Sequence, residues 1–150
     1  MLDRTMGEHP WTAAGGAALG QVLALSGKPE AAARAHREAL AMKRRVHGDE
    51  HPDVATSHHE LGEVLEELGR LTEAQDHLER ALAIEVRGSV APQALAATRF
   101  ALARVLRAQG SEPARARTLG EQALEGWEDV PPNLREEREA LEAWLAEPVE

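Results

Sequence analysis

Seven histidines are the first side chains in this sequence that could carry chemistry. His47 and His51 lie four residues apart, a spacing that chelates a metal ion when both residues stand on one helix. Gly48 and Pro52 interrupt the segment, so the two imidazoles do not share a continuous helix. No carboxylate-supported ligand set of the usual spacing accompanies them. The sequence therefore predicts no metal site.

Nucleophilic catalysis is the second chemistry to consider, because Ser57 directly precedes His58. Neighbouring positions on a helix point about 100° apart, so these side chains do not form a nucleophile–base pair. The chain has no cysteine, which excludes thiolate catalysis, disulfides and cysteine-ligated zinc or iron–sulfur sites. No covalent catalysis is indicated.

Acidic pairs and a glycine pair complete the candidates for chemistry. Glu66 and Glu67 are adjacent acids of the kind that a solvated helix face commonly carries, so they do not indicate general acid–base catalysis. Gly15 and Gly16 lack the Lys-Ser/Thr that follows a phosphate-binding glycine loop. The sequence therefore indicates a protein that is not an enzyme and uses no cofactor.

The composition indicates which elements carry these side chains. Alanine (28) and leucine (19) dominate, whereas the chain has one Phe, three Trp and no Tyr. Good helix formers thus outnumber the β-branched and aromatic residues that favour strands. With 43% hydrophobic residues, the chain is too apolar for general disorder. We expect a single all-α domain over residues 1–150.

The net charge narrows the classes of partner. The chain has 26 acidic and 17 basic residues, a balance of −9, and no basic block. Nucleic acids and anionic membranes are bound by clustered Lys and Arg, so neither is an expected partner. No stretch approaches the roughly 20 strongly apolar residues that span a bilayer. A cytoplasmic location is expected.

Internal repetition is the strongest pattern in the sequence. A Leu-small-x-x-Leu motif begins at Leu19, Leu61 and Leu102. A glycine stands four residues beyond each motif, at Gly27, Gly69 and Gly110. An alanine comes next, at Ala32, Ala74 and Ala116. The first two copies are 42 residues apart, and the third copy has one extra residue in its turn, within residues 111–113.

Each repeated residue has a structural reason. Two leucines four residues apart lie on one helix face, and the small residue beside the first lets another helix approach. The glycine supplies the left-handed residue that ends the first helix. Ala74 and its equivalents fit where the second helix crosses the first too closely for a larger side chain. The phrase His-Pro precedes two copies, at His9-Pro10 and His51-Pro52, and proline suits the first turn of a helix.

This pattern resembles the tetratricopeptide repeat, a family of paired antiparallel helices. The 42-residue period and the segment from His51 to Ser57 resemble the longer variant found in kinesin light chains and many bacterial proteins. The resemblance covers residues 7–128. It implies a right-handed α-solenoid of three helix-turn-helix repeats, at about residues 7–48, 49–88 and 89–128.

Seven helices are expected, near residues 10–26, 29–47, 52–68, 71–87, 91–109, 112–128 and 133–146. In the last of these, Asn133 and Glu136 predict a capping box directly after two prolines. Leu141 and Trp144 belong to its apolar stripe, and its other face is rich in Arg and Glu. It resembles the capping helix that ends such arrays, with one face on the last repeat and the other in water.

The first helices of such an array line a concave groove, so the resemblance predicts which side chains meet a ligand. For the second repeat these are His59, Glu63, Glu66 and Glu67, and for the third they are Phe100, Arg104 and Arg107. We expect a ligand of mixed charge, with its basic part at the glutamates and its acidic part at the arginines. The chain is therefore expected to be a non-catalytic scaffold that binds a peptide or protein partner.

Self-association is an alternative function, because residues 11–27 contain no charged side chain. Trp11, Ala14, Ala17 and Ala18 predict a smooth surface for close helix contact, with Trp11 as its anchor. Either a homodimer forms through the first helix, or a further repeat precedes it in a longer chain. A regulatory module of a larger bacterial signalling protein is a related reading, since the Ala-rich, Arg-over-Lys composition suits a high-GC bacterium.

Overall fold

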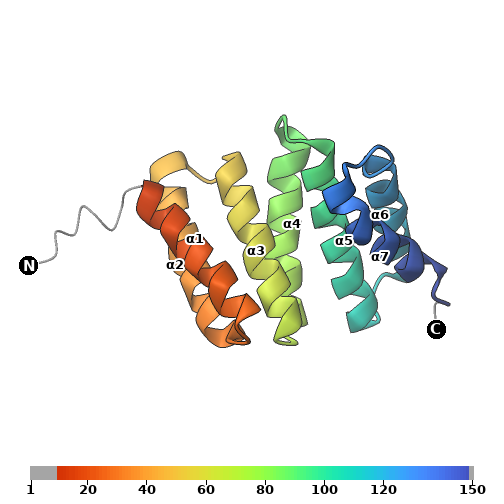
Figure 1. Ribbon diagram of the computed structural model, residues 1–150, viewed down its shortest axis with the longest axis horizontal. Coiled ribbons are helices and arrows are strands. Elements are labelled where there is room, and N and C mark those ends of the chain that lie inside the picture. The colour runs from red at the N-terminus through yellow and green to blue at the C-terminus, as the bar shows by residue number, and fades with distance from the viewer. Residues whose placement is uncertain (1–9, 149–150) are drawn as a thin grey trace, which may run out of the picture. The chain divides into compact units, whose positions relative to one another are not determined.

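The computed structural model describes residues 10–148, although the side chains of residues 10–15 and 17 lie outside the described part. The described residues form an all-α fold without strands (Figure 1). The α-helices are α1 (Pro10–Leu25), α2 (Pro29–His47), α3 (Pro52–Glu67), α4 (Leu71–Arg87), α5 (Pro92–Gln109), α6 (Pro113–Gly126) and α7 (Arg135–Ala146). A short 3₁₀-helix, η2 (Pro132–Leu134), precedes α7. The predicted all-α helical-repeat fold is confirmed.

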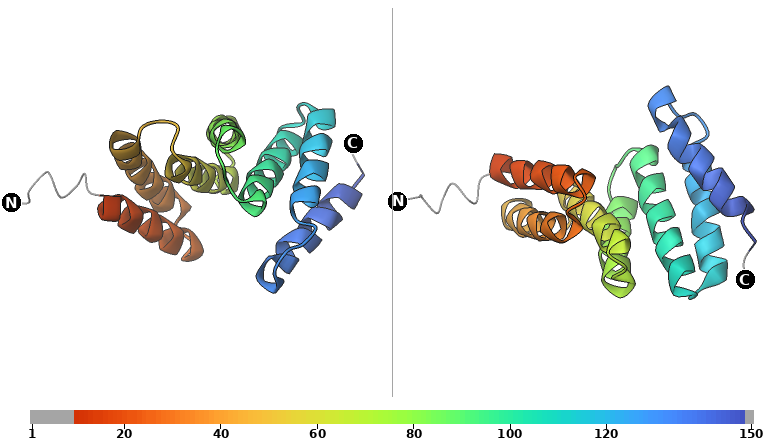
Figure 2. Two further views of the ribbon diagram at one scale, coloured as in Figure 1. Left: turned by 90° about the horizontal axis from the view of Figure 1, so that it is seen from above. Right: turned by 60° about the horizontal axis from the view of Figure 1, so that its bottom comes forward.

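The fold divides into two compact units near the end of α4. The N-terminal unit extends to Ile84, and the C-terminal unit begins at Glu85. Within the N-terminal unit, α1 packs against α2 and α2 packs against α3. Within the C-terminal unit, α5 packs against α6, and α7 contacts α6 (Figure 2). In both units, helices that are adjacent in the sequence therefore pack against each other, as the repeat pattern predicts.

Proline begins most of the helices. Pro10, Pro29, Pro52, Pro92 and Pro113 each occupy the first helical position. The proline ring holds φ near the helical value, and the missing N–H has no partner in a first turn anyway. The His-Pro phrase adds a cap at α3, where the backbone N–H of Asp53 donates to Nδ1 of His51 at 3.1 Å.

Glycine ends the first helix of each repeat. Gly27, Gly69 and Gly110 have φ of 74°, 77° and 69°, a left-handed conformation that glycine adopts without a Cβ penalty. The residue after each glycine donates its N–H to the second leucine of the repeated motif, as in the bond from Arg70 N to Leu65 O at 2.9 Å. The predicted stop signal is confirmed in all three repeats, because this bond satisfies a carbonyl that the helix leaves unpaired.

Small residues let the two helices of a repeat pack closely. Gly62 of α3 lies against Leu78 of α4, and a Cβ added at Gly62 would stand 2.6 Å from Leu78 Cγ. Gly20 of α1 lies in the same way against His36 of α2. Ala74, predicted for a helix crossing, is fully buried. The predicted close approach is confirmed, because a larger side chain at either glycine meets an occupied position.

The last helix begins differently from the prediction. The capping box of Asn133 and Glu136 is wrong, because residue 133 lies inside η2 and the residue before α7 is Leu134, which makes no side-chain capping bond. The N–H of Leu134 donates to Pro131 O at 2.9 Å, so the chain enters α7 through a tight 3₁₀ turn. Leu141 of α7 is fully buried in the core of the C-terminal unit.

None of the described helices combines the length and the apolarity that a bilayer-spanning helix requires.

Candidate functional site

The N-terminal unit contains a cavity of about 310 Å³ between α1, α2 and α3. Its lining consists of Gln21, Ala24, Leu25, His36, Glu60, Glu63, Val64 and Glu67. Two of the predicted groove residues, Glu63 and Glu67, are among them, and Glu60 adds a third carboxylate. We call this cavity the acidic groove.

Glu60 organises the floor of the acidic groove. Its Oε2 lies 3.3 Å from Nδ1 of His36, a buried ring of α2. Its Oε1 is 3.4 Å from the side-chain amide of Gln21, which donates from α1. One carboxylate of α3 thus contacts both helices of the first repeat, so Glu60 fixes the position of the groove walls as well as contributing charge.

The rim of the acidic groove is formed by the carboxyl-terminal half of α3. The Glu63 carboxylate lies 3.0 Å from Nε2 of His59, one helical turn earlier. Glu66 and Glu67 follow in the last turn, which contains no basic residue. The partial negative charge of a helix C-terminus disfavours carboxylates there and favours cations. This end of the groove therefore attracts a positively charged group.

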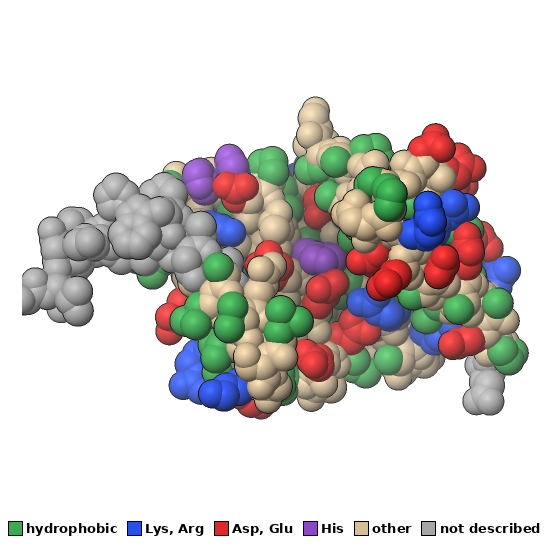
Figure 3. Space-filling model, viewed as in Figure 1, with side chains coloured by type: hydrophobic (Ala, Val, Ile, Leu, Met, Phe, Trp, Pro, Cys, Tyr) green, Lys and Arg blue, Asp and Glu red, His purple; other side chains and the backbone are tan. Residues whose placement is uncertain are grey.

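Apolar side chains border the acidic groove on α1. Ala24 and Leu25 line the groove, and Leu25 at the end of this helix is almost fully exposed. Leu19 and Val22, also on α1, are more than half exposed and lie outside the lining. In Figure 3 hydrophobic side chains gather over α1. Val64 contributes an apolar side chain to the lining from α3. The groove can therefore accept apolar as well as basic groups.

The predicted groove residues of the third repeat belong to the C-terminal unit, and α7 covers two of them. Phe100 is only 6% exposed, with its ring edge-to-face against Trp127 and Trp144. The Arg107 guanidinium stacks 3.4 Å from the Trp144 ring centre and donates to Trp144 O at 2.7 Å. Arg104 lies over the Phe100 ring at 4.6 Å. Phe100 and Arg107 thus hold the capping helix rather than facing an open groove.

The predicted self-association residues lie mostly outside the described side chains. This applies to Trp11, Ala14 and Ala17, whereas Ala18 is exposed. The apolar surface that the structure does describe on α1 is formed by larger residues, of which Leu19 and Val22 recur at equivalent positions in the later repeats.

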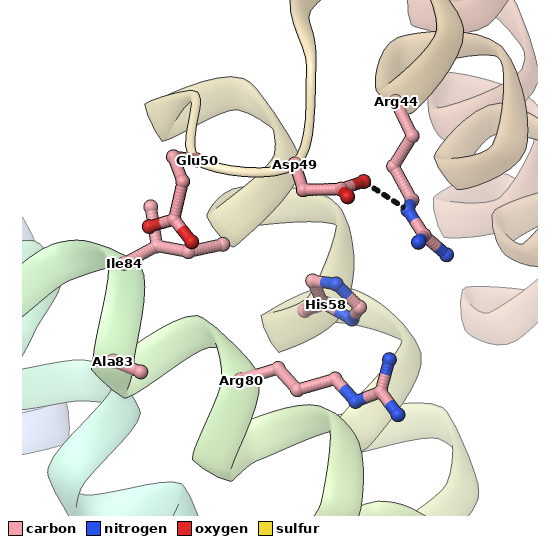
Figure 4. A pocket seen from close by; sticks show the side chains of 7 residues that line it. All are labelled: Arg44, Asp49, Glu50, His58, Arg80, Ala83 and Ile84. Carbon is pink, nitrogen blue, oxygen red and sulfur yellow. Dashed lines mark hydrogen bonds and ion pairs between the residues drawn. The ribbon is translucent and has the colours of Figure 1, made fainter.

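A second cavity of about 230 Å³ lies in the N-terminal unit near the α2–α3 turn (Figure 4). Arg44 and Asp49 form an ion pair of 2.8 Å at its edge, and this guanidinium lowers the pKa of the Asp49 carboxyl. Figure 4 shows the His58 ring between this pair and Arg80. The negative charge of Glu50 balances the positive charge of Arg80, so the carboxylates and guanidinium groups of the lining are equal in number.

His58, which is buried, pairs with the half-buried His77 between α3 and α4. Their Nδ1 atoms are 2.9 Å apart, and His58 is 4% exposed. Burial lowers the pKa of His58 to about 4, with further lowering by His77, Arg80 and Arg44. Burial also lowers the pKa of His77. Both rings are therefore neutral at pH 7, and one donates its Nδ1–H to the other.

The structure also brings together three residues that the sequence analysis did not combine. His47, His51 and Asp53 have potential ligand atoms that all lie within 4.8 Å of one another. The spacing His-x₃-His-x-Asp in the sequence is compatible with such a cluster. Gly48 and Pro52 argue against a cluster on one helix, because they end one helix and begin the next. A turn between two helices can juxtapose side chains as closely as a continuous helix does.

Comparison with known protein families and structures agrees with the repeat architecture. The sequence model of the tetratricopeptide repeat family matches residues 16–85. No curated protein matches the sequence. The crystal structure of BtubC (BKLC) from P. vanneervenii is similar at 25% identity with a TM-score of 0.77, over 85% of this chain and 53% of that one.

Two further structures show the same arrangement of helices. A kinesin light chain-like repeat protein from Podosopora anserina has 25% identity and a TM-score of 0.73, over 97% of this chain and 68% of that one. The N-terminal domain of stress-induced protein-1 from C. elegans shares the fold, with 16% identity and a TM-score of 0.64 over 89% of this chain and 96% of that one. The chain thus spans about half of BtubC and about two thirds of the Podosopora anserina protein. Residues 16–85 thus match the tetratricopeptide repeat family, and the helices of the chain resemble those of the kinesin light chain-like repeat protein from Podosopora anserina.

Proposed function

We propose that this chain is a non-catalytic scaffold whose acidic groove binds a basic, partly apolar segment of a partner protein. Tetratricopeptide repeats serve generally in protein–protein interaction. The observation that supports this ligand class is the convergence of Glu60, Glu63 and Glu67 in one cavity beside an exposed Leu25. The proposal narrows the mixed-charge ligand expected from the sequence to its basic part, because Arg107 contacts α7.

The balance of charges explains why a basic segment fits. The Glu60 carboxylate contacts Gln21 and His36, and the Glu63 carboxylate contacts His59. Both carboxylates add negative potential to the groove and are held in place by these contacts. Glu67 is exposed at the C-terminus of α3, where the helix dipole adds negative potential. A Lys or Arg from the partner offsets the negative potential around Glu67. An adjacent apolar side chain of the partner covers Leu25.

The binding test uses three fluorescein-labelled peptides of equal length. One alternates Lys and Leu, one replaces each Lys by Glu, and one replaces each Leu by Ser. We expect fluorescence anisotropy to show saturable binding of the Lys–Leu peptide, weakened by salt, and much weaker binding of the other two. Glu67→Lys is expected to weaken binding of the Lys–Leu peptide roughly tenfold, because it removes one attraction and adds one repulsion.

Glu38→Lys is the matched control for this substitution. Glu38 is exposed on α2 outside the lining of the acidic groove, and its replacement changes the net charge by the same amount. Binding by Glu38→Lys should stay within about twofold of the original protein. Equal losses in both variants would show that the peptide responds to net charge and not to the groove.

A second candidate function, self-association, is favoured by a comparison of equivalent positions. The pair Leu19 and Val22 on α1 is 54% and 58% exposed. In α3 the equivalent Leu61 and Val64 are 0% and 5% exposed, and the pair in α5 is fully buried. No helix precedes α1 among the described residues. The apolar surface of Leu19 and Val22 is therefore exposed on α1, whereas the equivalent surfaces of α3 and α5 are buried. We propose that α1 of a second copy covers it in a two-fold dimer, with Ala18 permitting close approach.

Light scattering at tens of micromolar protein tests the dimer. The chain has a mass of 16.3 kDa, and we expect a species of about twice that mass. Val22→Glu should convert it to the monomer, because a carboxylate in an apolar contact is left without a partner. Val86→Glu is the matched control, since Val86 is equally exposed but lies on α4. A monomeric mass for the original protein contradicts the dimer and leaves the groove proposal unaffected.

A further inference from the structure

The turn between α2 and α3 brings two imidazoles and a carboxylate to one point. His47 is the last residue of α2, His51 precedes the first residue of α3, and Asp53 follows in its first turn. Gly48, with φ of 83°, turns the chain sharply between them. The two imidazole rings stack with centres 4.2 Å apart and planes 19° apart. The turn therefore places the rings side by side, although neither helix contains both.

The potential ligand atoms of these residues lie close to one another. Nε2 of His47 lies 3.7 Å from Oδ2 of Asp53, and Nδ1 of His51 lies 3.8 Å from the same oxygen. Zinc bonds to nitrogen and oxygen of about 2.0–2.2 Å place tetrahedral ligand atoms roughly 3.3–3.5 Å apart. These two separations exceed that value by a few tenths of an ångström, and all three potential ligand atoms lie within 4.8 Å of one another. The stacked rings must turn to direct both nitrogens at one ion, and all three side chains are partly exposed.

We propose that His47, His51 and Asp53 bind one zinc ion, with solvent completing its coordination. Two imidazole nitrogens and one carboxylate oxygen suit zinc, whereas magnesium and calcium require sets of oxygen ligands. The C-terminal end of α2 contributes partial negative charge beside His47, which favours a cation. The site links the end of the first repeat to the start of the second within the N-terminal unit.

Zinc binding here has a structural cost that limits its affinity. Nδ1 of His51 accepts the backbone N–H of Asp53 at 3.1 Å, and it gives up this hydrogen bond when it binds the metal. The ion offsets the loss by joining α2 to α3 across the turn. Binding is therefore expected to be weaker than at a closed structural zinc site with four protein ligands, but to raise the melting temperature of the chain.

Calorimetric titration of the chelator-treated full chain with zinc chloride tests the site. We expect one equivalent of zinc to bind, a rise in melting temperature with zinc, and no effect of magnesium chloride. His47→Gln and Asp53→Asn should each weaken zinc binding at least tenfold. His51→Asn is designed to remove the imidazole while retaining a good helix-capping side chain, so that its fold and its melting temperature without zinc are preserved.

His59→Gln is the control, because His59 and Glu63 form another imidazole–carboxylate pair, 3.0 Å apart on α3. This variant should bind zinc as the original protein does. Absence of a binding heat, unchanged binding by His47→Gln, or a loss of binding in His59→Gln would each overturn the proposal. None of these outcomes bears on peptide binding in the acidic groove, so the two proposals are tested separately.

Discussion

Replacing Gly62 by alanine is expected to lower the free energy of unfolding by about 1 kcal/mol, although alanine is the better helix former. The gain in helix propensity is about 1 kcal/mol. The new Cβ would stand 2.6 Å from Cγ of Leu78, the branch carbon of a fully buried side chain. Overpacking of this kind costs about 1–3 kcal/mol or more, so the clash outweighs the propensity. Urea denaturation monitored by circular dichroism measures the change.

The same substitution at Gly16 is the matched control and should have the opposite sign. A Cβ at Gly16 meets Ala39 Cβ at 3.5 Å, an ordinary contact. Gly16→Ala is therefore expected to stabilise the chain by about 0.5–1 kcal/mol. If both variants shift the denaturation midpoint in the same direction, the close packing of α3 on α4 is not what distinguishes the two glycines.

The third repeat shows how the sequence satisfies the same constraint differently. Ala103 stands where the second repeat has Gly62, and Gly120 stands where it has Leu78. The larger residue of the pair is thus on the second helix in the second repeat and on the first helix in the third repeat. Gly120 in turn faces Trp144 and Leu145 of α7, so its lack of a side chain admits the capping helix.

Acidification from pH 7.5 to pH 5 is expected to lower the free energy of unfolding by about 2 kcal/mol through His58 alone. Its pKa is about 4 in the folded chain, mainly because of burial, against 6.5 for an ordinary histidine. Between these values the unfolded state binds a proton that the folded state does not. The stabilisation is complete above pH 6.5 and is lost as the pH falls towards 4.

His77 adds to this loss because burial lowers its pKa in the same direction. After a first added proton, one ring is a cation that can still donate its Nδ1–H to the other ring. A second added proton makes both rings cations, with their Nδ1 atoms 2.9 Å apart. Urea titrations at several pH values between 5 and 7.5 measure the dependence, in a range where most carboxyl groups remain ionised.

His58→Gln tests the assignment, since glutamine retains a donor and an acceptor but does not titrate. This variant should show a clearly smaller loss of stability on acidification. His59→Gln, at a half-buried position on the same helix, is the comparison variant and should retain the part of the pH dependence that comes from His58. An unchanged pH dependence in His58→Gln would assign the effect to other groups.

The helices and their ends were predictable from the sequence because the signals that set them are local. Proline at the first position acts through its own φ, and a left-handed glycine acts through bonds to residues within one turn. The 42-residue spacing then predicts that equivalent residues have equivalent surroundings, as Gly27, Gly69 and Gly110 do. The acidic character of the groove was predictable for the same reason, because Glu63 and Glu67 lie one turn apart on α3.

The sequence-based predictions failed where a local pattern competes with nearby residues or with another helix of the same chain. The pattern of Asn133 and Glu136 favours a capping box, but the two preceding prolines direct the chain into a 3₁₀ turn that includes residue 133. Phe100 and Arg107 lie on α5 at positions equivalent to groove residues, yet the structure places Trp144 of α7 against both. A repeat pattern does not reveal which residues a non-repeated helix will cover.

The repeat, the helix ends and the small residues between helices follow from the sequence, since each depends on residue type at a fixed spacing. The polar contacts of His58 with His77, Glu60 with His36, and His47 with His51 are known from the fold and not from the sequence. These contacts depend on the register and approach of separate helices. That register is set by the packing of whole faces, to which the polar residues themselves contribute little.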